Sequence, residues 1–265
     1  MSDRTGPVEE RPVRLLLNGR PLESWTASPG HADALAAGRL LAEGFIRGRD
    51  DLLELAVEER PDGTLIRARV PESAMAPALA ARGARATGEA GGSASDALRS
   101  PPGQAPADRP RAPLPPLDAF GRLFRELFAS AELYDRTGGL HTAALCDGTR
   151  LVRQVEEVGR HNAVDKAIGL AVLEGDDLSR LGLLLSARVS GEMARKAARA
   201  GLAWIASRSV PTTLAVALAE AAGLPIVARA AGAHPYVYGP TGASGATQAS
   251  AATAEGGMAR GRDGA

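Results

Sequence analysis

Apolar and polar positions in the first part of the chain predict two hairpins with a helix between them. Residues 13–26 alternate weakly around Asn18-Gly19, the strongest short signal for a hairpin turn. Residues 31–46 place Ala and Leu on roughly one helical face. Residues 53–70 alternate again on both sides of a Pro-Asp-Gly turn. We therefore expect a small α+β unit over residues 9–81.

Residues 117–238 show the longer, regular pattern of a layered α/β domain. Apolar residues from Phe120 to Phe128 recur at helical spacing, which predicts a packed helix. Four short apolar runs after it predict strands, and the first three each lead into a helix, the third with Pro211 in its first turn. These expected strands cover residues 151–155, 181–186, 202–206 and 225–228.

Two segments have a composition that does not favour a packed core. Residues 82–116 consist mainly of Ala, Gly, Ser, Pro and Arg and contain almost no bulky apolar side chain, so we expect a mobile low-complexity loop. Residues 239–265 have the same character and predict a disordered tail.

Charge and hydropathy exclude several classes of protein. Thirty-one basic and 31 acidic residues give a formal net charge of zero, which argues against a general nucleic-acid binder. No run of 18 apolar residues occurs, so no membrane span is expected. The charged first 12 residues contain no apolar stretch of a secretory signal, and the cytoplasm is the expected location.

Lysine is rare in this chain, since only Lys166 and Lys196 occur against 29 arginines. A lysine that survives such a bias suggests a position that needs a compact ammonium group rather than a planar guanidinium, although chance retention explains a single position equally well. Lys166 lies four residues after Asn162, one of only two asparagines.

Polar residues cluster in the three predicted strand-to-helix loops. Such loops gather at one edge of an α/β sheet, and each presents the free N–H groups of a helix N-terminus. Arginines in these loops predict a site for a phosphate-rich ligand; helix capping and solvated salt bridges are the alternative interpretation. The residues concerned are Arg160, His161, Asn162, Arg188, Ser190, Ser207, Arg208 and Ser209.

Three further features carry less information. Gly138 and Gly139 precede His141 and suggest either close approach of the backbone to a ligand or a tight turn. The four histidines lack metal-ligand spacing, so no metal site is expected. The single cysteine, Cys146, lies in an apolar run that predicts a buried thiol of raised pKa.

Several motifs together resemble the formate dehydrogenase accessory family (FdhD/NarQ). The central decapeptide Glu157-Val158-Gly159-Arg160-His161-Asn162-Ala163-Val164-Asp165-Lys166 is the most specific of them. The segments 137–141, 186–190, 209–212, 41–46 and 14–19 add to the resemblance, which runs from about residue 9 to 238.

This resemblance implies a cytoplasmic sulfur carrier. Family members accept sulfur from a cysteine desulfurase and pass it to a molybdenum bis-molybdopterin guanine dinucleotide cofactor before formate dehydrogenase receives that cofactor. The resemblance also implies a homodimer and a larger domain similar to cytidine deaminases. Its expected cofactor-binding residues are Gly138, Gly139, His141, Arg160, His161, Asn162, Lys166, Arg188, Ser190, Ser207, Ser209 and Arg229.

One departure from the family pattern affects the sulfur step. The two cysteines usual in the family correspond to Gly88 and Gly91 here, which leaves Cys146 as the only thiol. The alternative is therefore a cofactor-binding chaperone or regulator that has lost the sulfur relay. A zinc-dependent deaminase is disfavoured because the H-x-E and P-C-x-x-C patterns are missing.

Overall fold

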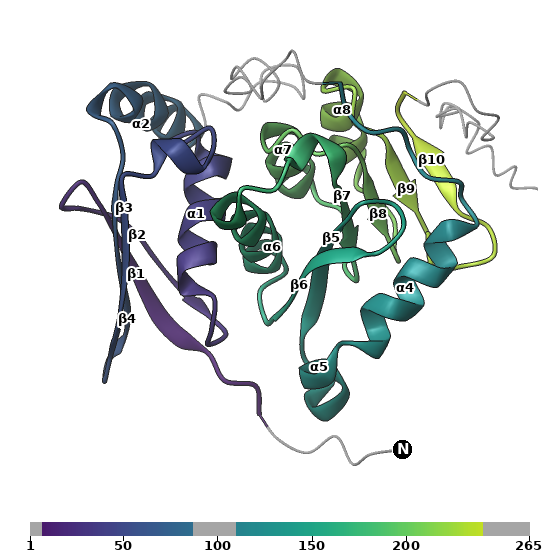
Figure 1. Cartoon of the computed structure of the whole chain (residues 1–265), viewed down its shortest axis with the longest axis horizontal. Coiled ribbons are helices and arrows are strands. Elements are labelled where there is room, and N and C mark those ends of the chain that lie inside the picture. The colour runs from purple at the N-terminus through teal and green to yellow at the C-terminus, as the bar shows by residue number, and fades with distance from the viewer. Residues whose placement is uncertain (1–6, 87–109, 241–265) are drawn as a thin grey trace, which may run out of the picture.

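The computed structural model describes residues 7–86 and 110–240. Two β-sheets enclose a layer of helices, and one further helix covers the far face of the second sheet (Figure 1). The α/β class expected from the sequence is confirmed. Residues 87–109, with Gly88 and Gly91, and residues 241–265 lie outside the described part, so the predictions for them stay predictions.

The N-terminal sheet contains both predicted hairpins in the order β2-β1-β4-β3. The two hairpins join side by side because β1 and β4 pair in parallel. Asn18 and Gly19 take the positive φ values, 49° and 78°, that a tight hairpin turn requires. The strands are β1 (Arg11–Leu17), β2 (Arg20–Ala27), β3 (Glu54–Arg60) and β4 (Gly63–Arg69).

Two helices accompany this sheet and, with it, form the N-terminal unit (residues 7–86). Helix α1 (Ala32–Glu43) ends at Gly44, which has a φ of 85° and so caps the helix in the left-handed region. Helix α2 (Glu72–Ala86) was not predicted, and its last turn occupies the start of the expected loop 82–116. The other end of that loop is also fixed, because Arg111 Nη1 donates to Ala222 O at 2.7 Å. The short 3-10 helix Arg49–Asp51 precedes β3.

The C-terminal sheet has six strands in the order β10-β9-β8-β7-β5-β6. Strands β6 and β7 both run antiparallel to β5 and are therefore parallel to each other, and β8 and β9 continue the parallel set. The sequence predicted these four strands but missed β5 and β10. The strands are β5 (His141–Cys146), β6 (Leu151–Glu157), β7 (Gly182–Leu185), β8 (Ile205–Ser207), β9 (Ile226–Ala228) and β10 (Tyr236–Tyr238).

Helices α6, α7 and α8 connect the strands as the sequence predicted, with one boundary corrected, whereas α5 was not predicted. Thr212 is the N-cap of α8 and accepts a hydrogen bond from Ala215 N at 3.2 Å, so Pro211 precedes this helix rather than occupying its first turn. The helices are α4 (Ala119–Ala129), α5 (Glu132–Thr137), α6 (Arg160–Glu174), α7 (Gly191–Arg199) and α8 (Thr213–Ala221), with a 3-10 turn at Leu178–Arg180.

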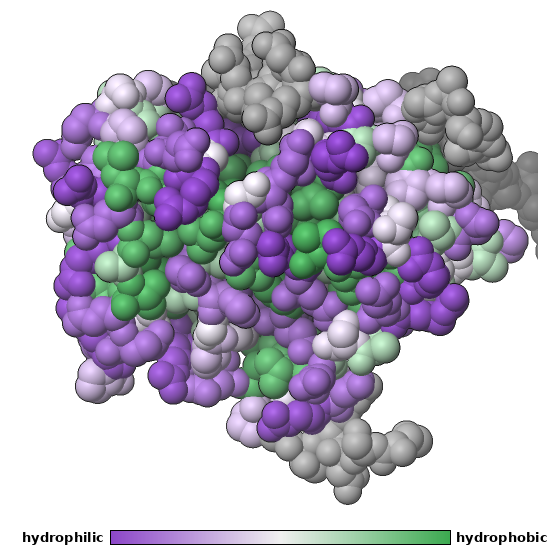
Figure 2. All heavy atoms as spheres, viewed as in Figure 1, coloured by the Kyte–Doolittle hydropathy of each residue, from purple (hydrophilic) through white to green (hydrophobic). Residues whose placement is uncertain are grey.

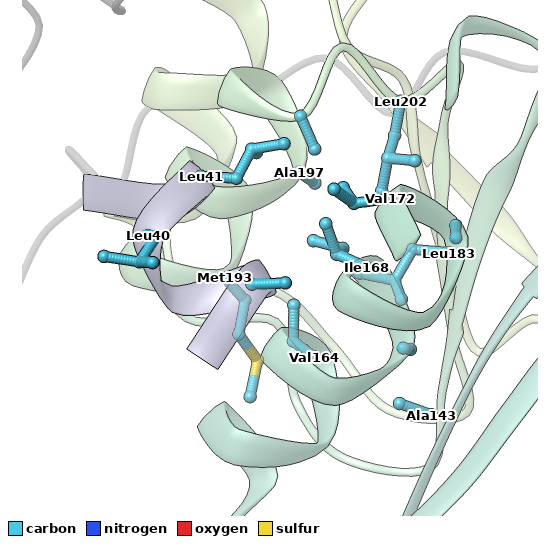
Figure 3. Packing of buried hydrophobic residues seen from close by; sticks show 14 of the residues in the cluster. Leu40, Leu41, Ala143, Val164, Ile168, Val172, Leu183, Met193, Ala197 and Leu202 are labelled. Atoms are coloured by element: carbon cyan, nitrogen blue, oxygen red, sulfur yellow. The ribbon is translucent and has the colours of Figure 1, made fainter. Parts of the chain in front are cut away.

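One apolar cluster joins the N-terminal unit to the C-terminal sheet. Leu40 and Leu41 of α1 belong to the same apolar cluster as Val164 and Ile168 of α6 and Met193 of α7, and Leu41 points toward α6 and α7 (Figure 3). All five side chains are at most 2% exposed, so the two units share a core instead of folding as separate domains.

The far face of the C-terminal sheet is covered by α4. Phe120 of α4 packs edge-on against Trp204, with ring centroids 5.3 Å apart.

No helix in the described ranges is long and apolar enough to cross a membrane. Figure 2 shows hydrophobic side chains at the surface over the N-terminal unit, at the left of that view, and in separate patches over the C-terminal part.

Candidate anion-binding site

The four parallel strands end at one edge of the C-terminal sheet, and an exposed arginine follows each of them. Arg160 follows β6, Arg188 follows β7, Arg208 follows β8 and Arg229 follows β9. Parallel strands direct their carboxyl ends to the same side, so the fold brings these four residues to one edge. We call this the carboxyl edge, formed by residues 158–162, 186–190, 207–212 and 229–235.

The positive charge at the carboxyl edge is largely uncompensated. The side chains of Arg160 and Arg188 have no hydrogen bond or ion pair with the described residues. The Arg208 guanidinium lies 5.5 Å from the centre of the Phe128 ring, and that of Arg229 lies 5.8 Å from the centre of the Tyr236 ring. Stacking on aromatic rings leaves the charge of both guanidinium groups free for an anion.

Hydrogen bonds between the loops hold the carboxyl edge in place. Ser207 is fully buried, donates from Oγ to Ala187 O at 2.7 Å and accepts from Ser209 N at 2.9 Å. Arg229 N donates to Ser209 O at 2.8 Å. Ser207 and Ser209 therefore fix the backbone from which the arginines project, and the buried Ser207 side chain does not face a ligand.

Helix α6 presents its N-terminus at the same edge. Its N-cap is Gly159, which has no side chain to bond the first backbone N–H groups. In contrast, α7 is capped by Ser190, whose Oγ accepts from Met193 N at 3.4 Å. The first turn of α6, next to Arg160, is thus the helix end best suited to an anion.

His141 reaches the carboxyl edge from the start of β5. It pairs with Glu157 in the sheet, and both burial and the charge of Arg160 lower the pKa of its imidazole. Gly138 has a φ of 70°, caps α5 and donates to Tyr134 O at 2.7 Å. Of the two interpretations offered by the sequence, the tight turn describes Gly138; Gly139 follows it, and a Cβ there would lie 2.9 Å from Val8 Cγ2.

Lys166 does not face the carboxyl edge, contrary to the expectation that it contacts a ligand. Its side chain is 1% exposed, and Nζ lies 2.5 Å from Glu157 Oε2 and donates to Ser28 O at 2.8 Å. Glu157 Oε1 in turn accepts from Ser28 N at 2.8 Å. Lys166 therefore joins α6 and β6 to the segment that follows β2.

Lys196 forms the second buried ion pair. Its Nζ lies 2.6 Å from Asp165 Oδ2 and 3.5 Å from the carbonyl oxygen of His161, and its side chain is fully buried. Both lysines of the chain thus form a buried ion pair that involves α6: Lys166 of α6 pairs with Glu157 of β6, and Lys196 of α7 pairs with Asp165 of α6. The rarity of lysine pointed to these positions, but Ser28, which binds Lys166, and Asp165, which binds Lys196, lie too far away in the sequence for these contacts to be predicted.

His161 and Asn162 lie beside a cleft between the N-terminal unit and helices α6 and α7, which we call the interunit cleft. Its volume is about 200 Å³. Asn162 Nδ2 donates to Thr26 O at 2.9 Å, and His161 Nε2 lies 3.2 Å from Ser190 Oγ. Burial, more than any neighbouring charge, lowers the pKa of His161. The predicted residues His161, Asn162 and Ser190 are therefore close together, and the side chains of all three have partners within the protein.

Arg39 and Glu23 of the N-terminal unit also line the interunit cleft and were missed by the sequence analysis. Arg39 Nη2 lies 2.5 Å from Glu23 Oε1, and Arg39 Nη1 lies 3.7 Å from Asp165 Oδ2. Neither residue lies in a motif that the sequence analysis selected. Only the packing of α1 on α6 brings them to this place.

Cys146 lies at the opposite end of β5 from His141. Five residues of extended strand separate the two positions, or about 17 Å. The thiol is completely buried, and burial raises its pKa to about 12. The sequence prediction of a shielded thiol is confirmed, and the location places it far from the arginines.

Known proteins are similar to this chain in sequence and in fold. The model of the FdhD/NarQ family matches residues 8–243. Curated relatives named sulfur carrier protein FdhD occur in Streptomyces avermitilis, 38% identical over 87% of this chain and 86% of the relative, and in Burkholderia cenocepacia, 37% identical over 83% and 82%. A crystal structure of a formate dehydrogenase accessory protein from Desulfotalea psychrophila superposes with a TM-score of 0.68 at 24% identity, covering 88% of this chain and 87% of that one.

The fold and the arginine-rich edge define an α/β protein with exposed positive charge at the carboxyl ends of its parallel strands. With a family match over most of its length, the chain belongs to the FdhD/NarQ family. Within the described ranges no three His, Cys, Asp or Glu side chains gather as metal ligands.

Proposed function

We propose that this protein is an accessory factor for formate dehydrogenase that holds the molybdenum bis-molybdopterin guanine dinucleotide cofactor at its carboxyl edge. The observation that carries the proposal is the set of four exposed arginines, one after each parallel strand. Guanidinium forks and free helix N–H groups are the donors that suit diphosphates. Such a donor set fits the phosphates of the two nucleotides of this cargo.

The residues have separate roles in this proposal. Arg160, Arg188, Arg208 and Arg229 bind phosphate, together with the first N–H groups of α6. Ser190, Ser207 and Ser209 fix the loops, and Lys166 positions α6 from within the core. The bound cargo supplies the molybdenum that receives sulfur; the protein supplies charge and shape.

Calorimetry with GDP tests the binding site. The affinity of GDP falls as salt rises, because phosphate contacts are screened. Arg160→Ala and Arg188→Ala each weaken binding by about 1–3 kcal/mol through loss of a charge-assisted contact. Arg180→Ala is the control, since Arg180 is exposed at the opposite edge of the same sheet, before β7. Equal affinity of all three variants contradicts the proposal.

The sulfur step divides two candidate functions. The similarity to proteins named sulfur carrier protein FdhD supports a sulfur carrier, which would receive sulfur from a cysteine desulfurase. The buried thiol of Cys146, with a pKa raised to about 12, supports a chaperone that holds the cofactor without carrying sulfur. We favour the chaperone, because the thiolate needed to accept sulfur does not form at Cys146 near neutral pH.

Mass spectrometry separates these candidates. The protein is incubated with a cysteine desulfurase and cysteine, and a persulfide adds about 32 Da. No gain, with GDP binding intact, agrees with the chaperone. A gain that is absent from Cys146→Ala makes Cys146 the carrier.

Location and assembly are part of the same proposal. We place the protein in the cytoplasm as a homodimer, since the client cofactor is assembled there before insertion. Strand β3 is an edge strand and exposes Val57, with Leu53 just before it, so it provides apolar surface for a second copy. Light scattering that reports a monomer at micromolar concentration contradicts the dimer.

A further inference from the structure

One part of the carboxyl edge stands apart from the rest. The β6–α6 junction (residues 157–162) carries Arg160, but β6 is the edge strand of its sheet, and β5 separates it from β7. The loops after β7 and β8 support each other, because Ser207 Oγ donates to Ala187 O at 2.7 Å. Among the described residues, one hydrogen bond, that of His161 Nε2, joins the β6–α6 junction to the loop after β7. The junction therefore needs support from another part of the molecule.

The N-terminal unit supplies this support through Ser28, the residue directly after β2. The Ser28 N–H donates to Glu157 Oε1 at 2.8 Å, and its Oγ accepts from Val158 N at 3.0 Å. Its carbonyl oxygen accepts from Lys166 Nζ at 2.8 Å. Ser28 is 9% exposed, so water competes little for these bonds. All three polar groups of one buried residue thus bond β6, α6 and the turn between them.

Two further hydrogen bonds act on the β6–α6 junction. Asn162 Nδ2 donates to Thr26 O at 2.9 Å, and Gly159 N donates to Glu157 Oε1 at 3.3 Å. The N–H groups of residues 158 and 159 are therefore used within the protein. Those of residues 160–162 have no acceptor among the described residues, as is usual in the first turn of a helix, and they stay available to an anion.

Ser28 is itself anchored on both sides. Ala27 is the last residue of β2 and pairs with β1 in the N-terminal sheet. On the other side, Gly30 and His31 turn the chain into α1 with φ values of 85° and 53°. Pro29 restricts Ser28 further, because the residue before a proline avoids the helical region. A shift of Ser28 would thus require β2 or α1 to move with it.

We propose that Ser28 is a positioning residue of the carboxyl edge: its hydroxyl holds the β6–α6 junction in the conformation that presents Arg160 and the free N–H groups of α6 to a polyphosphate. The inference rests on the proposed function for the class of ligand. It adds that the N-terminal unit, which contributes no arginine to the carboxyl edge, determines how tightly that edge binds.

The size of the effect follows from the bond that is removed. Ser28→Ala deletes the acceptor of Val158 N and leaves the backbone bonds of Ser28 to Glu157 and Lys166 in place. One neutral hydrogen bond shifts an equilibrium by about three- to tenfold. A ligand that binds only the held conformation loses affinity by the same factor. We expect calorimetry to show about three- to tenfold weaker binding of pyrophosphate and of GDP by Ser28→Ala.

Ser179→Ala is the matched control. Ser179 is also 9% exposed, and its Oγ donates to Asp177 Oδ1 at 2.7 Å, so the substitution again removes one hydrogen bond of a buried serine. Ser179 lies before β7, at the opposite edge of the C-terminal sheet. Urea unfolding measures the stability of both variants. We expect both to lose stability, and Ser28→Ala alone to lose affinity. Ser28→Thr keeps a hydroxyl and should bind like the natural chain.

A double-mutant cycle identifies which part of the edge Ser28 positions. Arg160 lies in the junction that Ser28 holds, whereas Arg188 follows β7. Ser28→Ala should therefore cost less affinity for GDP in the Arg160→Ala chain than in the natural chain. In the Arg188→Ala chain it should cost as much as in the natural chain. A loss of stability alone would not distinguish the two arginines.

Hydrogen exchange tests the same bond without a ligand. The Val158 amide loses its acceptor in Ser28→Ala, and we expect it to exchange about three- to tenfold faster. Its exchange in Ser179→Ala and in Ser28→Thr should match that of the natural chain.

Four results overturn the inference: an unchanged affinity of Ser28→Ala, equal losses of affinity in Ser28→Ala and Ser179→Ala, a stable Ser28→Thr protein that binds as weakly as Ser28→Ala, and unchanged exchange of Val158. If Arg160→Ala and Arg188→Ala still weaken GDP binding in that case, the proposed function stands without Ser28. If only Ser28→Ala weakens binding, Ser28 positions the N–H groups of α6 and the arginine site fails. If the natural chain binds neither probe, both proposals fail.

Discussion

Gly169 of α6 lies directly against Gly38 of α1. A Cβ atom on Gly169 would come within 2.8 Å of the Gly38 amide nitrogen, and one on Gly38 would lie 1.9 Å from Asp165 O. Two glycines at the crossing thus let the helix backbones approach more closely than any side chain permits. This contact sets the position of the N-terminal unit on the C-terminal sheet.

Replacing either glycine by alanine forces these helices apart. We expect Gly169→Ala and Gly38→Ala to lower the free energy of unfolding by at least 1–3 kcal/mol, roughly the range for overpacked cores. Gly121→Ala in α4 is the control: its Cβ would meet only Arg125 Nη1 at 3.7 Å, so about 0.5–1 kcal/mol of stabilisation is expected. Urea unfolding of the three variants checks the prediction. Equal changes in the free energy of unfolding for all three variants would mean that the crossing of α1 and α6 can accommodate a Cβ atom.

Lys166 contributes to stability through its buried partner. Lys166→Met leaves Glu157 buried without its cation, and we expect a loss of about 3–5 kcal/mol. Adding Glu157→Gln removes the unpaired charge and restores part of the loss. Arg60→Ala, at an exposed pair with Glu58, should change stability far less. If the Lys166→Met protein has normal stability but binds GDP more weakly, the structural role is wrong and Lys166 contacts the ligand.

Cys146 should be unreactive in the folded protein. We expect no modification by a thiol reagent at pH 8 until urea unfolds the chain, because the thiol is buried and its pKa is raised to about 12. The folded pKa exceeds the ordinary value of 9.0, so this contribution to stability is present below pH 9 and is lost as the pH rises toward about 12. The difference in unfolding free energy between the natural chain and Cys146→Ala, measured as a function of pH, gives the contribution of this thiol. Rapid modification of native protein would contradict the buried location.

Glu23 makes the joint between the units sensitive to acid. Burial alone would raise the pKa of this carboxyl, but the hydrogen bonds and charges of Arg39 and Arg82 lower it below its ordinary value of 4.5. Its contribution is therefore present above pH 4.5 and is lost as the pH falls through the lower, folded pKa. We expect Glu23→Gln to be about 1–3 kcal/mol less stable than the natural chain at pH 7. The gap should close in acid, whereas Glu54→Gln, at an exposed pair, should show little gap at either pH.

Local signals explain which elements could be predicted from the sequence. Asn18 and Gly19 readily adopt the positive φ angles that a tight hairpin turn requires. Ser190 caps α7, as expected. Strand β5 was missed because residues 143–146 contain neither β-branched nor aromatic side chains. Helix α2 was missed because Pro77 and a weak apolar stripe hide its periodicity.

The candidate site was predictable only where the topology alone determines it. Parallel strands bring Arg160 and Arg188 to one edge whatever the details of packing. The burial of Lys166 depends on Ser28, 138 residues away, and no local pattern carries that information. A charged residue in a recognised motif can therefore be buried in the core instead of contacting a ligand.

The insertion of α1 between the two sheets has a consequence for biosynthesis. Its covering helix α6 ends at Glu174, about 130 residues after α1 ends at Glu43. At 5–20 residues per second the ribosome needs roughly 6–26 s to supply that cover. During this interval Leu40 and Leu41 have no native partner from α6 or α7. The apolar face of α1 therefore stays uncovered until α6 has been synthesised. We expect holding chaperones to bind nascent chains of this protein at α1 during that interval.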